Sequence, residues 1–172
     1  NAYADDKKLN KLSDFVKKSQ DNLAKIVQSL DLQLAYIIYP NGQKLDIICE
    51  EGSLLEPHIQ LLLVLKLVDM TASRDKKMKI YLPVSTPDFL DSYFQNLEIE
   101  RGKFSGVKAS KLKEYDVVAN LGGSFAFCEF AYSFDALFAS IKILEMLCQC
   151  NKGIAEVKNA LPTFYFHYEK IP

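Results

Sequence analysis

The sequence has no tryptophan, and its 172 residues include only two histidines, four cysteines, seven glycines and six prolines. So few cysteine and histidine residues argue against a disulfide-stapled scaffold and leave few ligands for zinc. No apolar run approaches the roughly 18 residues that a membrane-spanning helix needs. Lysine plus arginine (21) nearly balance aspartate plus glutamate (22), so the chain has no overall field that would attract nucleic acid or an anionic membrane.

What is present is typical of a globular protein. Hydrophobic residues make up 49% of the chain and charged residues 25%, so it can bury a substantial core. The cysteines lie in or beside apolar runs and no secretory segment precedes the first apolar pattern, so we expect buried, reduced thiols and a cytoplasmic location. Cys148 and Cys150 point roughly 200° apart on a helix, which favours thiols over a metal site. Because the chain begins Asn1-Ala2, we expect a piece of a longer polypeptide.

The first third of the chain predicts a helix, a hairpin and the start of a second helix. Apolar residues recur every three or four positions over residues 5–30, which indicates an amphipathic helix. Leu34–Tyr39 and Leu45–Cys49 are short apolar runs on either side of Pro40-Asn41-Gly42, which predicts a β-hairpin with Asn-Gly supplying positive φ angles. Ser53 is expected to cap a helix over Leu54–Met70 that is apolar on most sides and therefore buried.

The rest of the chain alternates between strand and helix patterns. Strands are predicted at Lys79–Val84, near Ile99, and at Val117–Leu121, Phe125–Phe130 and Thr163–Tyr168; helices are predicted from Thr86-Pro87-Asp88 to about Leu97, from Ser110 to Glu114 and from Phe134 to Cys148, the last ended by Asn151-Lys152-Gly153. This order predicts an α/β fold in which a mixed sheet is packed with helices.

One segment carries a family resemblance. Phe125–Phe138, FAFCEFAYSFDALF, followed by Ile143-Leu144-Glu145, resembles a strand-loop-helix unit of the α-D-phosphohexomutases, the phosphomannomutases and phosphoglucomutases. Ala160-Leu161-Pro162 is similar to the lead-in to the last domain of that family. The resemblance covers about residues 23–172. It implies the end of a domain II-like unit at 1–53, a domain III-like α/β domain at 54–155 and a lead-in to a final domain at 156–172.

The hairpin turn then falls on the metal loop of the family, Asp-Gly-Asp-x-Asp-Arg, whose three carboxylates hold magnesium. In this chain the three positions are Tyr39, Asn41 and Gln43, and Lys44 replaces the arginine. Mg²⁺ is a hard cation that prefers anionic oxygen ligands, so the resemblance implies a degenerate metal loop without metal. Asp46 is the one nearby carboxylate, and we expect it to be a solvated strand residue that points to one face of the sheet.

The sugar-recognition loop of the family, Gly-Glu-x-Ser-Gly, aligns with Ala119-Asn120-Leu121-Gly122-Gly123, which lacks both the glutamate and the serine. The resemblance nevertheless implies substrate contacts in this region, and the alternative is a structural turn with solvated lysines near it. The candidate substrate-binding residues are Lys108, Asn120, Gly122, Gly123 and Ser124.

No catalytic residue is assigned. Thr71-Ala72-Ser73 looks like the start of the phosphoserine loop of the family, but it follows the metal loop instead of preceding it, so we interpret it as the end of a helix. His58 is interpreted as a capping or surface residue and His167 as an exposed strand residue.

The resemblance therefore implies a catalytically silent phosphohexomutase-like module, similar to those joined to a mannose-1-phosphate guanylyltransferase or related nucleotidyltransferase. The module itself would need no cofactor, whereas the nucleotidyltransferase would use Mg²⁺. Its partners would be the remaining domains of the polypeptide, a second copy of the chain and a sugar phosphate, but not nucleic acid or membranes. The alternatives are an active phosphomannomutase or phosphoglucomutase fragment and a purely structural interaction domain.

Overall fold

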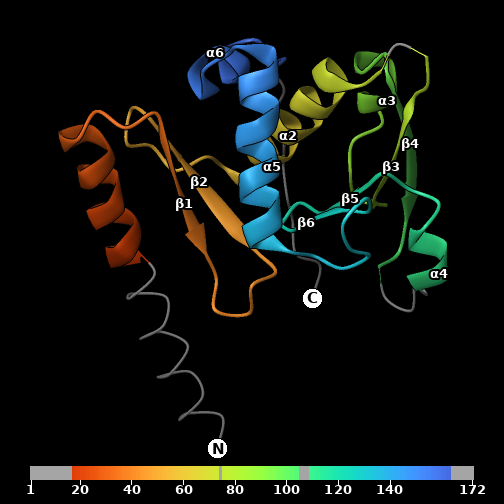
Figure 1. The fold of residues 1–172 in the computed structure, drawn as a ribbon, viewed down its shortest axis with the longest axis horizontal. Helices are drawn as coiled ribbons and strands as arrows, with labels where there is room; N and C mark the ends of the chain where they lie inside the picture. The colour runs from red at the N-terminus through yellow and green to blue at the C-terminus, as the bar shows by residue number, and fades with distance from the viewer. Residues whose placement is uncertain (1–16, 74, 105–108, 164–172) are drawn as a thin grey trace, which may run out of the picture.

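The structure is a computed structural model that describes residues 17–73, 75–104 and 109–163. A helix over residues 17–29 lies beside a two-stranded hairpin, and the other elements surround a four-stranded sheet (Figure 1). The hairpin is formed by β1 (Leu34–Ile38) and β2 (Leu45–Cys49), and the sheet by β3 (Met78–Pro83), β4 (Leu97–Gly102), β5 (Val117–Ala119) and β6 (Phe125–Phe127). The remaining helices are α2 (Pro57–Thr71), α3 (Leu90–Tyr93), α4 (Ala109–Leu112), α5 (Ala136–Cys150) and α6 (Ile154–Asn159). The predicted α/β fold with a mixed sheet is confirmed.

The sheet has the strand order β4-β3-β5-β6, in which β4, β3 and β5 are parallel and β6 is antiparallel to β5. Ile80 in the central strand β3 pairs with both Ile99 and Val117. The three parallel strands therefore end at the same edge, where the turn from β5 to β6 also lies. In open α/β sheets this carboxyl edge is where ligands usually bind.

Both faces of the sheet are covered, because side chains alternate along each strand. On one face Ile80, Val117 and Phe125 belong to the main core, which also holds buried residues of α2, α5 and α6. On the other face Tyr81 and Val118 form a smaller cluster with Tyr115, Ala126 and Cys128, against which Phe104, Leu112 and Phe134 pack. The middle of β3 and the strands β5 and β6 are thus apolar on both faces, as expected for strands enclosed between layers, whereas the edge strand β4 has exposed glutamates at Glu98 and Glu100.

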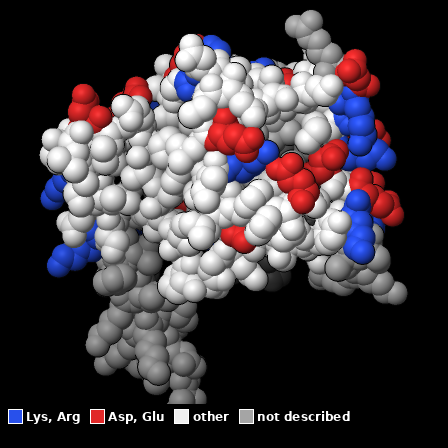
Figure 2. All heavy atoms as spheres, viewed as in Figure 1, with Lys and Arg blue, Asp and Glu red and all other residues white. Residues whose placement is uncertain are grey.

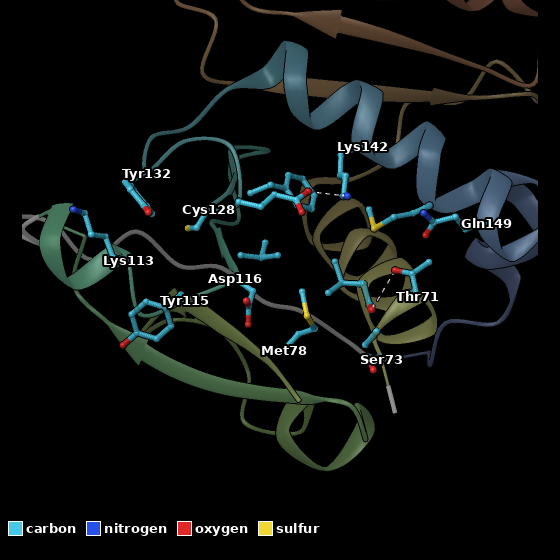
Figure 3. Close-up of a pocket in the computed structure, with 16 residues that line it drawn as sticks. Thr71, Ser73, Met78, Lys113, Tyr115, Asp116, Cys128, Tyr132, Lys142 and Gln149 are labelled. Carbon is cyan, nitrogen blue, oxygen red and sulfur yellow. Dashed lines mark hydrogen bonds and ion pairs between the residues drawn. The ribbon is translucent and has the colours of Figure 1, made fainter. Parts of the chain in front are cut away.

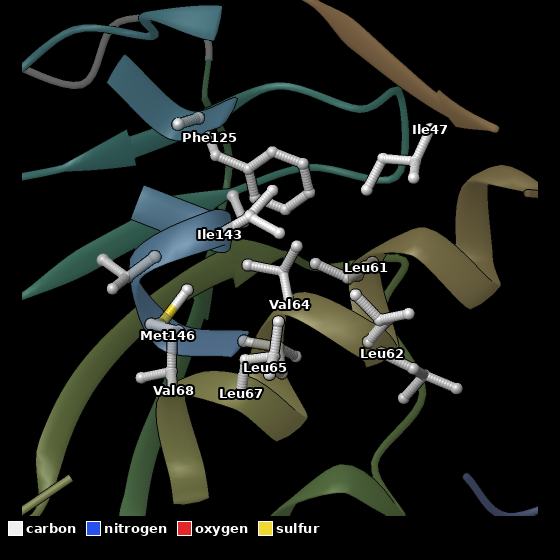
Figure 4. Close-up of a cluster of buried hydrophobic side chains, with 14 of the residues drawn as sticks. Ile47, Leu61, Leu62, Val64, Leu65, Leu67, Val68, Phe125, Ile143 and Met146 are labelled. Carbon is white, nitrogen blue, oxygen red and sulfur yellow. The ribbon is translucent and has the colours of Figure 1, made fainter. Parts of the chain in front are cut away.

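Helix α2 forms the centre of the main core, as its unbroken apolar sequence predicts. Leu61 and Leu65 are almost fully buried and lie near Ile143 of α5 and Phe125 of β6 (Figure 4). Ile47 of the hairpin belongs to the same core, so the hairpin packs against the sheet through α2. None of the described helices is long and apolar enough to cross a membrane.

The predicted hairpin is confirmed, with β1 and β2 paired from Leu34–Cys49 to Ile38–Leu45. The turn differs from the expected Asn-Gly geometry, because Gly42 has a φ of 68° whereas Asn41 is not among the residues with positive φ. The Gly42 amide donates to the Tyr39 carbonyl across 2.8 Å, and the Asn41 side-chain oxygen accepts from the Gln43 amide at 3.1 Å. One left-handed residue is therefore enough to reverse the chain.

The predicted start of the buried helix is wrong. Helix α2 begins at Pro57 with Glu56 as its N-cap, and Ser53 lies outside it. The Ser53 carbonyl instead accepts from the Cys49 amide at 2.9 Å, and Leu54 forms an isolated bridge with Ile48. The chain stays extended to Glu56 because it pairs with β2, and because a residue before proline avoids the helical region.

The helix predicted from Thr86-Pro87-Asp88 to Leu97 is much shorter, since α3 covers only Leu90–Tyr93. The Asn96 amide donates to the Asp69 carboxylate at 2.9 Å, and the Asn96 side chain donates to the Asp69 carbonyl at 3.1 Å. These bonds hold Asn96 at the end of α2, so the chain leaves the helix and enters β4 at Leu97.

Helix α5 begins and ends as its sequence indicates. The Asp135 carboxylate accepts from the Phe138 amide at 2.9 Å, and Asn151 closes the helix in a left-handed conformation with a φ of 50°. Helix α6 follows at once and was not predicted. It includes residues 155 and 156, between which the sequence-based domain division falls.

The expectation of buried thiols holds for Cys49 and Cys128, whereas Cys150 is partly buried and Cys148 is exposed. The prediction is wrong for Cys148 because the outer side of α5 is itself apolar. Its exposed residues there include Leu137, Ile141 and Leu144. Of the last predicted strand, only Thr163 lies within the described residues, and it is not in a strand.

Candidate functional site

The tip of the hairpin packs against the turn between β5 and β6. The Leu45 amide donates to the Gly123 carbonyl across 2.9 Å, and the Ala136 amide at the start of α5 donates to the Gly42 carbonyl across 2.8 Å. The two loops that the family resemblance singles out, far apart in sequence, are therefore neighbours at the carboxyl edge of the sheet. This junction is the candidate functional site.

The only carboxylate at the hairpin tip belongs to Asp46, whose exposed fraction is 7%. It accepts a hydrogen bond from the Tyr39 hydroxyl at 2.7 Å and lies 3.5 Å from the Lys44 ammonium. Gln20 of the first helix donates to the same carboxylate at 3.4 Å. The expectation of a solvated Asp46 is wrong: strand alternation places Tyr39, Lys44 and Asp46 on one face, and Gln20 reaches that face from the first helix.

The electrostatics of the tip oppose a bound cation. Burial raises the pKa of Tyr39, and its hydrogen bond with Asp46 raises it further, so the phenol remains a neutral donor. The Lys44 ammonium lies 4.2 Å from the centre of the Tyr39 ring and supplies a positive charge of its own. One carboxylate, already engaged by a phenol and an ammonium, does not fit the ligand set of Mg²⁺.

The other expected metal-loop positions add no anionic ligand. Asn41 and Gln43 are exposed neutral amides, and the Asn41 oxygen is used within the turn. Across the described ranges, no group of three or more histidine, cysteine, aspartate or glutamate residues is arranged to hold a metal ion.

The turn between β5 and β6 is held by the side chain of Asn120. Its amide oxygen accepts from the Gly122 amide at 2.7 Å and from the Ser124 amide at 3.2 Å, and Ser124 is buried. Gly123 has a φ of 83°, and a Cβ atom there would collide with the Leu45 carbonyl oxygen. Asn120 and Gly123 are therefore both needed for the shape of this turn. Of the Asn120 side chain, only the Nδ2 group is then available for a hydrogen bond to a ligand.

Gln60 of α2 is a structural part of the site that the sequence did not single out. Its side-chain oxygen accepts from the Ile47 amide at 3.1 Å, and its nitrogen donates to the Leu45 carbonyl at 2.8 Å. The amide group therefore satisfies the outer edge of β2 beside the contact with Gly123. A glutamine in a helix that is apolar on most sides was the available signal, because buried polar groups are almost always hydrogen-bonded.

Arg101, at the end of β4, is committed to the loop that follows β3. Its guanidinium donates to the Thr86 carbonyl at 3.0 Å and the Pro87 carbonyl at 2.8 Å, and it lies 2.8 Å from the Asp91 carboxylate. The side chain therefore stabilises a turn and is not presented to an anion. Lys108, one of the candidate substrate-binding residues, lies outside the described residues.

The two histidines contribute nothing to the candidate site within the described residues. His58 is in the first turn of α2, and its Nε2 atom lies 3.4 Å from the Glu56 carboxylate. It lines a crevice with Pro87 and Leu121 of only about 10 Å³, which is the space of roughly one water molecule. His167 lies outside the described residues.

The triplet Thr71-Ala72-Ser73 ends helix α2, as predicted, because α2 stops at Thr71 and the Thr71 hydroxyl donates to the Leu67 carbonyl at 2.8 Å. This end of α2 precedes Met78, where β3 begins, so it lies at the amino edge of the sheet. The triplet is therefore on the opposite side of the sheet from the hairpin tip.

The sequence matches no known family profile and no curated protein. The fold, in contrast, is similar to that of a phosphoglucomutase/phosphomannomutase family protein from Burkholderia thailandensis, with a TM-score of 0.67 at 18% identity over 85% of this chain and 32% of that one. It is also similar to a protein assigned as a phosphomannomutase from Thermus thermophilus, with a TM-score of 0.66 at 15% identity over 83% of this chain and 33% of that one. The chain thus has a phosphohexomutase-like fold and spans about one third of the length of these two proteins.

Proposed function

We propose that this chain is a phosphohexomutase-like module that does not transfer phosphate. The observation that carries the proposal is the state of Asp46, the one carboxylate at the hairpin tip, which is buried and bonded to Tyr39 beside Lys44. Phosphoryl transfer depends on positioned charges, above all a divalent cation that neutralises the phosphate oxygens. A site whose only carboxylate is already neutralised by its own chain does not attract that cation.

The sugar-binding side of the junction supports the same proposal. A hydroxyl-reading loop needs free acceptors and donors, whereas the Asn120 oxygen is used by two amides of its own turn. Gly122 and Gly123 offer only backbone groups, and the Gly123 carbonyl is bonded to Leu45. The module would bind a sugar phosphate only weakly and without catalysis, through Asn120 Nδ2, Ser124 and Lys108.

We further propose that the module belongs to a protein of sugar-nucleotide biosynthesis, such as a mannose-1-phosphate guanylyltransferase joined to a phosphohexomutase-like region. The fold similarity supports only the phosphohexomutase-like part. The nucleotidyltransferase reaction, with its Mg²⁺, would take place in another domain of a cytoplasmic parent protein. In this arrangement residues 1–53 complete a second domain, 54–155 form a third and 156–172 lead into a fourth. The module then serves folding, assembly with a second copy or the sensing of a sugar phosphate.

Thermal unfolding of the purified chain tests the role. Mannose 1-phosphate and glucose 1-phosphate are each added at millimolar concentration with Mg²⁺, and inorganic phosphate at the same ionic strength is the control. A ligand that binds only the folded state must raise the melting temperature. A rise with the sugar phosphates alone supports sensing, and no rise supports a structural role. A coupled assay that detects Mg²⁺-dependent interconversion of the 1- and 6-phosphates would overturn the proposal.

A further inference from the structure

A cavity of about 410 Å³ opens at the amino edge of the sheet, on the opposite side from the hairpin tip. It lies between the end of α2, the beginnings of β3 and β5, the end of β6 and the second half of α5 (Figure 3). Pockets that hold small molecules in proteins span roughly 300–1,000 Å³. Nothing in the proposed function uses this cavity.

Part of its lining is apolar and consists of Val68, Met78, Val117, Phe127 and Met146. Four charged side chains lie among the other lining residues, and their formal charges cancel: Lys113 and Lys142 are basic, and Asp116 and Glu129 are acidic. The cavity therefore combines apolar surface with polar groups but has no net charge that would select an ion.

The central polar group is the ion pair between Lys142 and Glu129, whose atoms lie 2.7 Å apart (Figure 3). Lys142 also contacts Glu145 at 3.0 Å. Two of the three ammonium hydrogens of Lys142 are thus used by carboxylates, which leaves one donor, and the second oxygen of Glu129 remains an acceptor. An anion that binds to Lys142 would have to displace these carboxylates, whereas a neutral hydroxyl group can use the remaining ammonium hydrogen and the free carboxylate oxygen.

The remaining polar groups have the same mixed character. One oxygen of Asp116 accepts from the Lys79 amide at 2.7 Å, and the other adds an acceptor. Tyr132 lines the cavity with an exposed fraction of 42%, so its ring lies at the opening, where Lys113 is 5.5 Å from the ring centre. Aromatic rings with a polar tip suit a ligand that has both apolar and polar surface.

We infer that this cavity binds an uncharged pyranose-type sugar. Two neighbouring hydroxyl groups can bind the Lys142–Glu129 pair together, because one accepts from the ammonium while the other donates to the carboxylate. The C–H surface of the ring packs on the apolar lining formed by Met78 and Met146. The inference does not depend on the proposed function, because no residue of the hairpin tip lines the cavity.

The three methionines of the chain provide the test. Met78 and Met146 line the cavity, whereas Met70 does not. The protein is labelled with ¹³C at the methionine methyl groups and titrated with methyl α-D-mannopyranoside or methyl α-D-glucopyranoside to about 50 mM, since the few contacts predict a Kd of roughly 1–10 mM. The expected result is a saturable shift of the Met78 and Met146 signals with Met70 unchanged.

Matched variants connect the shift to the ion pair. Lys142→Gln and Glu129→Gln are each expected to weaken binding about tenfold, because each removes a hydrogen bond to a charged group. Lys152→Gln and Glu156→Gln are the controls, since these two residues form an ion pair outside the cavity. The methionine methyl spectrum of each variant without sugar is compared with that of the wild type to check that the variant is folded.

Three results would overturn the inference. They are the absence of a shift at Met78 and Met146 across the titration, equal shifts at all three methionines, and sugar affinity that is unchanged in both Lys142→Gln and Glu129→Gln. Tighter saturation by free leucine, a zwitterion with an apolar side chain, would also overturn it. A failure here leaves the proposed function standing, because that proposal is tested with sugar phosphates and mutase assays.

Discussion

The Tyr39 hydroxyl, one residue after the end of β1, donates a hydrogen bond to the carboxylate of Asp46 in β2 across 2.7 Å. Lys44 lies beside both groups, 3.5 Å from the carboxylate and 4.2 Å from the centre of the phenol ring. The negative charge of Asp46 is therefore neutralised by Lys44 and hydrogen-bonded by Tyr39 without any ligand. Acidic and basic side chains also occur together over the face in Figure 2, whereas Asp46 is buried, with an exposed fraction of 7%.

Placing three carboxylates at the tip should create a site for a divalent cation. The variant Tyr39→Asp/Asn41→Asp/Gln43→Asp places three acidic groups around Asp46, so mutual repulsion should lower its melting temperature without metal. Millimolar Mg²⁺ should then raise that temperature, because the cation neutralises the carboxylates and binds only the folded turn. Differential scanning calorimetry at constant ionic strength measures the change.

The wild-type protein and the single variant Asn41→Asp serve as controls for this experiment. Aspartate at position 41 can keep the hydrogen bond to the Gln43 amide, so the turn itself should be preserved. Neither control should respond to Mg²⁺ beyond the effect of ionic strength. A Mg²⁺-specific rise in the wild-type melting temperature would contradict our account of Asp46.

Gly123→Ala should destabilise the protein by about 2–4 kcal/mol, since the residue has a positive φ and a Cβ would strike the Leu45 carbonyl. Urea unfolding followed by circular dichroism measures the loss. Gly153→Ala is the matched control, because a Cβ there meets no atom within 4 Å. Its cost should stay within about 1 kcal/mol. Equal losses in the two variants would show that the packing at Gly123 is not the cause.

Gln60→Leu should also be costly, although it increases the apolar surface of α2. The change leaves the Ile47 amide and the Leu45 carbonyl buried without their partner, and each such group costs about 1–3 kcal/mol. Gln43→Leu, at an exposed position of the turn, is the control. Chemical unfolding should separate the two variants by at least about 2 kcal/mol, and a neutral or stabilising Gln60→Leu would refute the role of the amide.

The thiol of Cys128 should make stability fall at alkaline pH. Burial raises its pKa to about 11, and the Asp116 carboxylate adds to the effect. The unfolded chain releases this proton near pH 9, so the contribution is complete below about pH 9 and is lost as the pH rises toward 11. The slope is at most about 1.4 kcal/mol per pH unit.

Unfolding free energies of wild type and Cys128→Ala, measured from pH 8 to about pH 11, isolate this contribution in their difference. The variant should lose less stability over that range, whatever its stability at neutral pH. Cys148→Ala is the control, since its side chain is exposed. Parallel curves for wild type and Cys128→Ala would show that the thiol does not ionise on unfolding.

The sequence was sufficient for the features that depend on neighbouring residues. The hairpin around Gly42, the buried helix α2 and the stop at Asn151 follow from periodicity and turn chemistry, and each is confirmed. The short α3 could not be foreseen, because Asn96 is held by Asp69 from a different helix. A contact of this kind is tertiary and overrides local helix propensity.

The candidate site shows the same division. Alternation along β2 predicts that Asp46 points to one face of the sheet, but its burial depends on Tyr39 and on Gln20 from the first helix, which the alternation does not reveal. Similarly, the exposure of Cys148 follows from the position of α5 and not from its apolar neighbours. Local patterns predict which side a residue faces, whereas tertiary packing decides whether water reaches it.

The hydrogen bond from Leu45 to Gly123 has a consequence for the order of folding. The Leu45 amide at the outer edge of β2 has no partner until the ribosome has added Gly123, so a nascent chain that stops earlier carries an incompletely paired, strongly apolar strand. Such edges pair readily with other chains, and long-range closure of this kind slows folding. We therefore expect strand β2 to need co-translational chaperones most while the ribosome synthesises the residues between Leu45 and Gly123.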